Sequence, residues 1–208
     1  MRNNGIGSLR TSLFLMSAAL MLILSCAFVD RTAKVGMKRD VYTKQLSTSK
    51  TLYMGDVWEK SPSLRQGIVK NGYGWETANV YTETSPVEFI KQTLAKELSR
   101  YGYRVIDAGK SKSKYPRISI EVFQAFCEPY LAWTYINYDA VVEVEITLEM
   151  GRGKAYKRRV KGIGRHRATD SCGMPKTLCI ECNYEDSYAM ALEDFVKKSV
   201  PAIAEMVK

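Results

Sequence analysis

Apolar and polar side chains alternate along two long stretches in the second half of the chain, as in strands of a sheet with one wet face. The apolar sides of the two stretches carry Ile118, Ile120, Val122, Gln124 and Phe126, and then Ala140, Val142, Val144, Ile146 and Leu148. Gly151-Arg152-Gly153 is typical of a turn, so residues 155–167 are predicted to return as a further antiparallel strand.

Apolar residues recur at spacings of three and four in two other regions, which predicts helices over residues 85–101 and 184–207. Ser85 followed by Pro86 is a good helix start, and Gly102 a good stop, whereas Pro201 is expected to kink or divide the second helix. Short strands are predicted at 33–37, 64–70 and 78–81, the last two joined by a glycine-rich turn. The fold class is therefore predicted to be α+β: a two-layer sandwich of a mostly antiparallel sheet packed by two helices.

The first 25 residues are typical of a bacterial export signal. Arg2 and Arg10 precede an apolar run over residues 13–24, which is shorter than the ~20 residues of a membrane span. We expect residues 1–25 to be a cleaved signal peptide, 26–32 a tether, and 33–208 one domain. An ordinary signal peptide with a chance cysteine, or an uncleaved anchor, are the alternatives.

The signal ends at Leu24-Ser25-Cys26, which resembles the lipobox of bacterial lipoproteins. This resemblance implies a diacylglycerol on the Cys26 thiol and an N-acyl lipid such as palmitate on its new amino group, with no other cofactor. Several acyl chains hold a protein on a membrane because each buried methylene contributes about 0.8 kcal/mol. Ala27 in place of aspartate implies the outer membrane, with the domain facing the periplasm.

Basic residues exceed acidic ones, 31 to 22, and seven of the basic residues lie within residues 154–167. Arg158, Arg159 and Lys161 are therefore candidates for binding an anionic lipid or glycan. However, a turn centred on Arg152 places Glu145 opposite Arg159 and Glu143 opposite Lys161, so cross-strand ion pairs account for the pattern. An exported protein is not expected to bind nucleic acid.

Five cysteines are present, and the four beyond Cys26 are Cys127, Cys172, Cys179 and Cys182. An even number in an exported chain favours two disulfides, with Cys127 bonded to one of the later three. A redox pair of Cys179 and Cys182, and a zinc site formed by all four, are the alternatives.

Aromatic residues gather between the two long strands, where Tyr130, Trp133, Tyr135 and Tyr138 are candidates for binding a partner protein or meeting a membrane interface. Packing over the open end of the sheet is the alternative. The single histidine, His166, has no nucleophile at a recognisable spacing, so the sequence predicts no catalytic residues and no metal ligands beyond the cysteines.

Several segments together resemble the YajG-like bacterial lipoproteins. They are the glycine-rich run 69–74 with Glu76-Thr77-Ala78, the helix start Ser85-Pro86-Val87 and the stop Tyr101-Gly102-Tyr103-Arg104-Val105. The resemblance implies an envelope lipoprotein with a compact α+β domain and no known activity. The leading hypothesis is a non-enzymatic, membrane-anchored accessory that binds another envelope protein. A carrier of anionic lipid or glycan and an envelope thiol-disulfide oxidoreductase are the alternatives, and the sequence predicts no oligomeric state.

Overall fold

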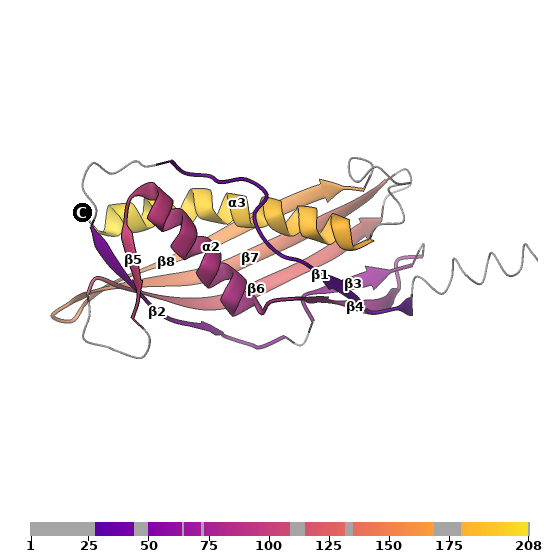
Figure 1. The fold of residues 1–208 in the computed structure, drawn as a ribbon. Helices are drawn as coiled ribbons and strands as arrows, with labels where there is room; N and C mark the ends of the chain where they lie inside the picture. The colour runs from indigo at the N-terminus through magenta and orange to yellow at the C-terminus, as the bar shows by residue number, and fades with distance from the viewer. Residues whose placement is uncertain are drawn as a thin grey trace, which may run out of the picture.

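The computed structural model describes residues 28–43, 50–63, 65–71, 73–108, 115–131, 135–168 and 180–207. In this part of the chain, eight strands form one sheet that curls around two helices (Figure 1). The strands are β1 (Arg31–Ala33), β2 (Thr51–Glu59), β3 (Gly67–Lys70), β4 (Glu76–Thr82), β5 (Arg104–Asp107), β6 (Arg117–Leu131), β7 (Ile136–Gly151) and β8 (Lys154–Arg167). The helices are α2 (Pro86–Tyr101) and α3 (Ile180–Met206). The predicted signal peptide and Cys26 lie outside the described residues.

The long strands β6, β7 and β8 form the antiparallel meander that the alternating pattern predicts. All five apolar positions of β7 from Ala140 to Leu148 are fully buried, since they face the helices. The predicted register is confirmed: Glu145 lies opposite Arg159, and Glu143 opposite Lys161. The turn between these strands has positive φ angles at Gly151, Arg152 and Gly153.

The predicted two-layer sandwich with a mostly antiparallel sheet is wrong, because the sheet is mixed and curled into a half-barrel. β1 runs parallel to β4, and β2 runs parallel to both β5 and β6. Strands β2 and β5 have no counterpart in the sequence-based prediction. The alternation of β2 is interrupted by a register shift between Met54 and Val57, which hides its period of two.

Two different strands pair with one edge of β6. β2 pairs with the first part of β6, from Arg117 to Val122, and β3 pairs with it only at Cys127. The other edge of β6 is paired with β7 from Arg117 to Leu131, with a register shift between Val122 and Gln124. Between the end of β2 and the start of β3, the first edge therefore has no strand partner among the described pairings.

Both helices form where the apolar periodicity predicts them. The Ser85 side chain accepts a hydrogen bond from the Glu88 amide at 3.3 Å, and Gly102, with a φ of 120°, ends α2. α3 begins at Ile180, earlier than predicted, and it continues undivided past Pro201. Neither of these helices is long and apolar enough to cross a membrane.

Two glycines of β8 let α3 approach the sheet at backbone distance. A Cβ atom added at Gly164 would lie 2.0 Å from the Ser187 carbonyl oxygen, and one at Gly162 would lie 2.2 Å from that of Ala191. No side chain fits at either position without displacing the helix. This glycine pair therefore sets the distance between α3 and the sheet.

The segment after β1 crosses over the helices and is fastened to them by acidic side chains (Figure 1). The Lys34 amide donates to the Glu185 carboxylate at 3.0 Å, and the Val41 and Tyr42 amides both donate to the Glu97 carboxylate at 3.0 Å. Glu97 is buried but also pairs with Arg100 at 3.0 Å, so its charge is compensated. The N-terminal part of the domain is thus an integral part of the fold.

Candidate functional site

The break between β2 and β3 forms a small hollow, here called the notch. It is lined by Glu59, Ser61, Ser63, Pro86, Val122, Phe123, Gln124, Ala125 and Phe126, and its volume is about 180 Å³. Backbone hydrogen bonds close the notch at both ends: the Lys60 amide donates to the Val122 carbonyl at 2.8 Å, and the Cys127 amide donates to the Gln66 carbonyl at 2.9 Å. Between these two bonds, none of the described strands pairs with this edge of β6.

Side-chain hydrogen bonds fix the rim of the notch. The Ser63 hydroxyl donates to the Arg65 carbonyl at 2.6 Å, and the Ser63 amide donates to the Glu59 carboxylate at 3.2 Å. The buried Gln66 side chain donates to the Ser63 carbonyl at 3.1 Å and accepts from the Thr82 amide at 3.2 Å. The rim is therefore pre-formed, which lowers the entropy lost when a ligand binds.

The floor of the notch is apolar, with positive charge close by. The Phe123 ring lies 4.3 Å from the Lys60 ammonium and 4.0 Å from the Arg159 guanidinium, both measured to the ring centroid. Cation–π contacts of this kind hold an aromatic ring in a half-exposed position. Phe123 is the residue at the register shift of β6, which explains why the predicted face of Ile118 and Val122 does not continue to Gln124, an exposed side chain.

The three basic candidates on β8 are engaged in ion pairs. Arg159 pairs with Glu143 at 2.6 Å, Lys161 lies 3.9 Å from the same carboxylate, and Arg158 lies 3.8 Å from Glu205 of α3. Further along the strand, Arg165 makes two bonds to Asp139, at 2.8 and 2.7 Å. The basic residues therefore lie on β8, an edge strand of the described sheet, and form ion pairs there. Charges on an edge strand also discourage pairing with another chain.

The cysteine prediction is not supported at Cys127, which is a free, fully buried thiol. Burial raises the pKa of this thiol well above its usual value, so it is poor in reactive thiolate. Cys172 and Cys179 lie outside the described residues, and Cys182, near the start of α3, is not a free thiol. Within the described ranges, no group of histidine, cysteine and carboxylate side chains is placed to hold a metal ion.

Cys127 belongs to a buried cluster that joins α3 to the sheet. Tyr184 donates its hydroxyl to the Ile68 carbonyl, and Tyr188 donates to the Gln66 carbonyl at 2.5 Å. The Tyr138 ring meets the Tyr184 ring edge to face at 5.0 Å. Burial raises the pKa of Tyr138 to about 12 and that of Tyr184 further. Because Tyr188 bonds to Gln66, this cluster also supports the rim of the notch.

The four aromatic candidates do not form one surface. Tyr130 is exposed, Tyr135 is half-buried with the Arg167 guanidinium 4.3 Å from its ring centroid, and Trp133 lies outside the described residues. Tyr138 is buried, so its assignment to a binding surface is wrong. Its position two residues before Ala140 places it on the inward face of β7.

Sequence reasoning missed the most exposed aromatic residues, Tyr73 and Trp75, in the β3–β4 turn. The available signal was two large rings flanking a glycine in a predicted turn. The rim residues of the notch were also missed. His166 lies 3.6 Å from Asp186, which also pairs with Lys38 of the crossing segment, so the histidine belongs to the contacts that hold this segment to α3.

The molecule is thus defined by a curled mixed sheet with two helices on its inner face and a pre-formed notch at a split strand edge. No protein-family model and no curated protein matches this chain. The predicted resemblance to the YajG-like lipoproteins is therefore not confirmed at the level of that family.

Three solved structures resemble the fold at low sequence identity. A Xanthomonas campestris protein of the family DUF330 is 8% identical, with a TM-score of 0.48, over 86% of this chain and 98% of that one. A hypothetical protein from Chlamydia trachomatis is 11% identical, with a TM-score of 0.42, over 76% and 96%. Rare lipoprotein B from Shewanella oneidensis is 9% identical, with a TM-score of 0.36, over 57% and 90%. Similarity at this level transfers no function.

Proposed function

We propose that this chain is a lipid-anchored, non-enzymatic module of the bacterial cell envelope that binds another envelope protein at the notch. The supporting observation is the interrupted pairing of β6, which leaves residues 123–126 without a strand partner on one edge. An extended segment of a partner can hydrogen-bond to such an edge while a pocket beside it takes a side chain. The anchor itself is inferred from the sequence around Cys26.

The size of the notch favours a protein ligand over a small molecule. Its volume of about 180 Å³ is below the roughly 300–1,000 Å³ of typical small-molecule sites. A single apolar side chain of a partner matches that space and the lining of Pro86, Ala125 and Phe126. We therefore expect a short extended segment with one apolar anchor residue to bind there.

The alternative of an anionic lipid or glycan ligand has less support, since Arg158, Arg159 and Lys161 already have acidic neighbours. A buried Cys127 likewise adds nothing to a thiol-exchange mechanism.

A photo-crosslinking amino acid at Gln124 tests the notch in native envelopes. We expect one discrete crosslinked partner, which disappears when Ala125→Arg fills the notch in the same protein. The same crosslinker at Arg152, in the β7–β8 turn, is the matched control. Identical products from both positions, or a product unaffected by Ala125→Arg in a protein with normal thermal unfolding, would contradict binding at the notch.

Intact mass of the protein extracted from its native membrane tests the anchor. We expect a mass that fits cleavage before Cys26 and acylation of this residue, and loss of the acyl mass in Cys26→Ser. An unacylated parent protein would refute the anchor while leaving the notch testable by crosslinking.

A further inference from the structure

Four aromatic side chains stand out as the most exposed large hydrophobic residues among those described: Tyr73 at 86%, Trp75 at 71%, Tyr130 at 65% and Phe28 at 62%. None of them contributes to the core, so the fold does not require them. Exposed aromatic residues gathered at one place indicate a binding surface or a membrane interface.

All four belong to one end of the molecule, here called the aromatic end. Tyr73 and Trp75 flank the β3–β4 turn, with their ring centroids 6.0 Å apart. A Cβ atom at Gly74 would lie 4.0 Å from the Leu131 side chain, which places this turn beside the end of β6 that carries Tyr130. β1 runs parallel to β4, so Phe28, just before β1, lies on the side where β4 begins (Figure 1).

The aromatic end is rigid. The Asn71 side chain accepts hydrogen bonds from the Tyr73 and Trp75 amides, both at 3.0 Å, and so fixes the turn that displays the rings. The Asp30 carboxylate accepts from the Asn79 amide at 2.7 Å and ties the start of the described chain to β4. The exposed rings of Tyr73 and Trp75 are therefore carried by residues whose backbone amides have hydrogen-bond partners.

Phe28 is the second residue after Cys26. Two fully extended residues span at most about 7 Å. The Cys26 backbone consequently lies within that distance of Phe28, so a bilayer that holds acyl chains on Cys26 lies close to the aromatic end. Tyrosine and tryptophan are the side chains enriched at the boundary between lipid and water.

We propose that the aromatic end inserts Phe28, Tyr73, Trp75 and Tyr130 into the head-group region of the bilayer that holds the anchor. This proposal rests on the lipid anchor at Cys26. It gives the protein a fixed orientation, with β6 rising away from the membrane over about 45–50 Å. The notch, halfway along β6, then faces the periplasm roughly 15–30 Å from the lipid surface.

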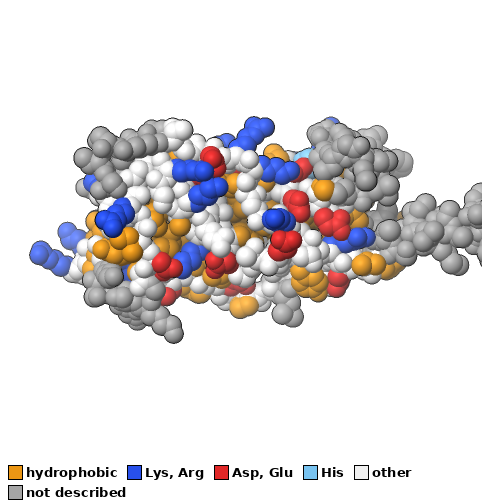
Figure 2. Space-filling view, in the orientation of Figure 1, with side chains coloured by type: hydrophobic (Ala, Val, Ile, Leu, Met, Phe, Trp, Pro, Cys, Tyr) orange, Lys and Arg blue, Asp and Glu red, His pale blue; other side chains and the backbone are white. Residues whose placement is uncertain are grey.

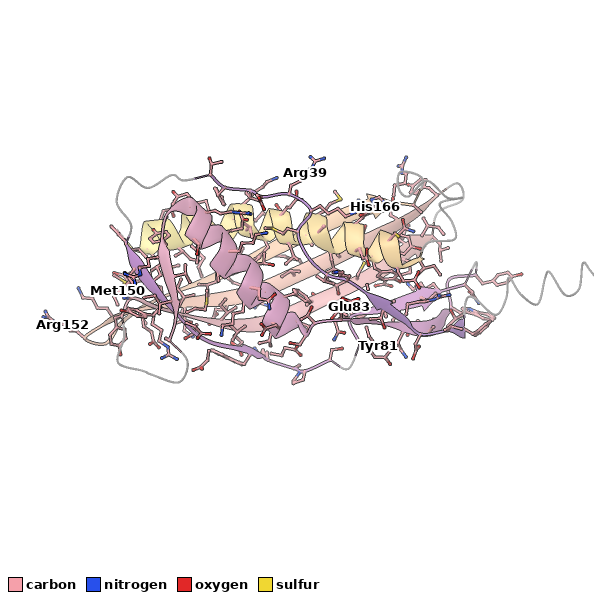
Figure 3. The ribbon with its side chains drawn as sticks, viewed as in Figure 1. Arg39, Tyr81, Glu83, Met150, Arg152 and His166 are labelled. Atoms are coloured by element: carbon pink, nitrogen blue, oxygen red, sulfur yellow. The ribbon has the colours of Figure 1, made fainter. Side chains whose placement is uncertain are left out.

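The two ends also differ in charge. Near the aromatic end, Arg65 pairs with Glu76 at 3.0 Å and Lys70 pairs with Glu128. The opposite end is strongly basic: Figure 2 shows Lys and Arg side chains gathered there, and Figure 3 shows Arg152 at its tip, pointing away from the body. We therefore expect insertion at the aromatic end to depend on the aromatic rings and not on charge. An uncharged phosphatidylcholine bilayer is then sufficient for insertion.

Single-tryptophan proteins test the proposal in the full lipidated chain, reconstituted into phosphatidylcholine vesicles brominated along the acyl chains. One variant keeps Trp75 (Trp58→Phe, Trp133→Phe), and its matched control keeps Trp58 (Trp75→Phe, Trp133→Phe). We expect the brominated lipid to quench Trp75 roughly twofold or more relative to plain lipid, and to leave Trp58 unquenched. A third protein, Arg152→Trp without the other tryptophans, reports on the basic end and should also stay unquenched.

Flotation of the vesicles distinguishes a failure of the insertion from a failure of the anchor. If the protein floats with the vesicles but Trp75 is quenched no more than Trp58, the insertion is refuted and the anchor stands. Quenching at position 152 instead would show that the basic end faces the bilayer and would equally refute the proposal. A wild-type protein that does not float at all would refute the anchor and the insertion together.

Discussion

The two ends of this molecule differ in how they are built and in what they expose. The aromatic end is assembled from three short strands, β1, β3 and β4, together with the end of β6, and Arg65 and Lys70 form ion pairs there. The basic end is the tip of one long hairpin, where Arg152 points away from the body (Figure 3) and Lys154 is exposed. The difference shows that one sheet can expose aromatic side chains at one end and basic side chains at the other.

The rigid centre is the feature whose loss should have the largest effect, because it holds both ends in place. We expect Gly164→Ala to lower the free energy of unfolding by about 3 kcal/mol or more, since its Cβ atom would collide with the backbone of α3. Gly36→Ala is the control, because no atom lies within 4 Å of the added Cβ. Urea unfolding measures both, and equal stabilities would show that α3 is not fixed by this contact.

Alkaline pH should weaken the half of the molecule that carries the aromatic end. The pKa of Tyr138 is raised to about 12 by burial, so the folded state keeps its proton while the unfolded chain loses it above pH 10. This stability is complete below pH 10 and is lost as the pH rises through 12, by about 2–3 kcal/mol. Urea unfolding at pH 9 and 12 should show a smaller loss in Tyr138→Phe than in the parent. An unchanged pH dependence would argue that Tyr138 does not titrate as a buried group.

Removal of a single hydroxyl should lower the stability of the aromatic end more than that of the basic end, with a smaller total loss. Tyr184→Phe takes away the donor to the Ile68 carbonyl of β3, which we expect to cost about 1–2 kcal/mol. Tyr156→Phe, an exposed tyrosine of the hairpin, should have no measurable effect. Hydrogen exchange should further show faster opening of β3 than of β8 in Tyr184→Phe. Uniform acceleration of both strands would mean that the ends are not independent.

The smallest effect is expected for charge reversal at the basic end. Arg152→Glu combined with Lys154→Glu should leave vesicle flotation and the quenching of Trp75 unchanged, because these residues lie far from the lipid in the proposed orientation. A drop in Trp75 quenching in this variant, measured as in the single-tryptophan experiment, would show that the hairpin contributes to membrane contact.

Local signals account for the parts of the fold that the sequence predicted. β7 alternates regularly between buried and less buried side chains, and the turn to β8 contains two glycines, so the register of this hairpin followed from counting residues. α2 has a cap, a proline and a stop at the expected places. The burial of Tyr138 also follows from a local signal, because it lies two residues before Ala140 and so on the same face of β7.

The mixed sheet and the notch depend on contacts between distant segments, so local patterns do not predict them. β2 pairs in parallel with β6, some sixty positions later, and its alternation breaks at Gly55 and Asp56. The notch exists because β2 and β3 pair with two different parts of the same edge of β6 and leave the part between them without a described strand partner. Its rim residue Gln66 is polar in sequence but buried in the fold, where hydrogen bonds compensate it.

The shared edge of β6 also affects the order in which the strands of the sheet can pair. β2 and β3 both precede β6 in the chain, and both need β6 to complete their pairing, although β2 also pairs with β5 and β3 with β4. The later strands β7 and β8 follow β6 directly and pair with their immediate predecessors. Local hairpins form faster than contacts between distant segments. The strands before β6 can thus form two separate paired units, β2 with β5 and β1, β3 and β4 together, and β6 joins these units into one sheet.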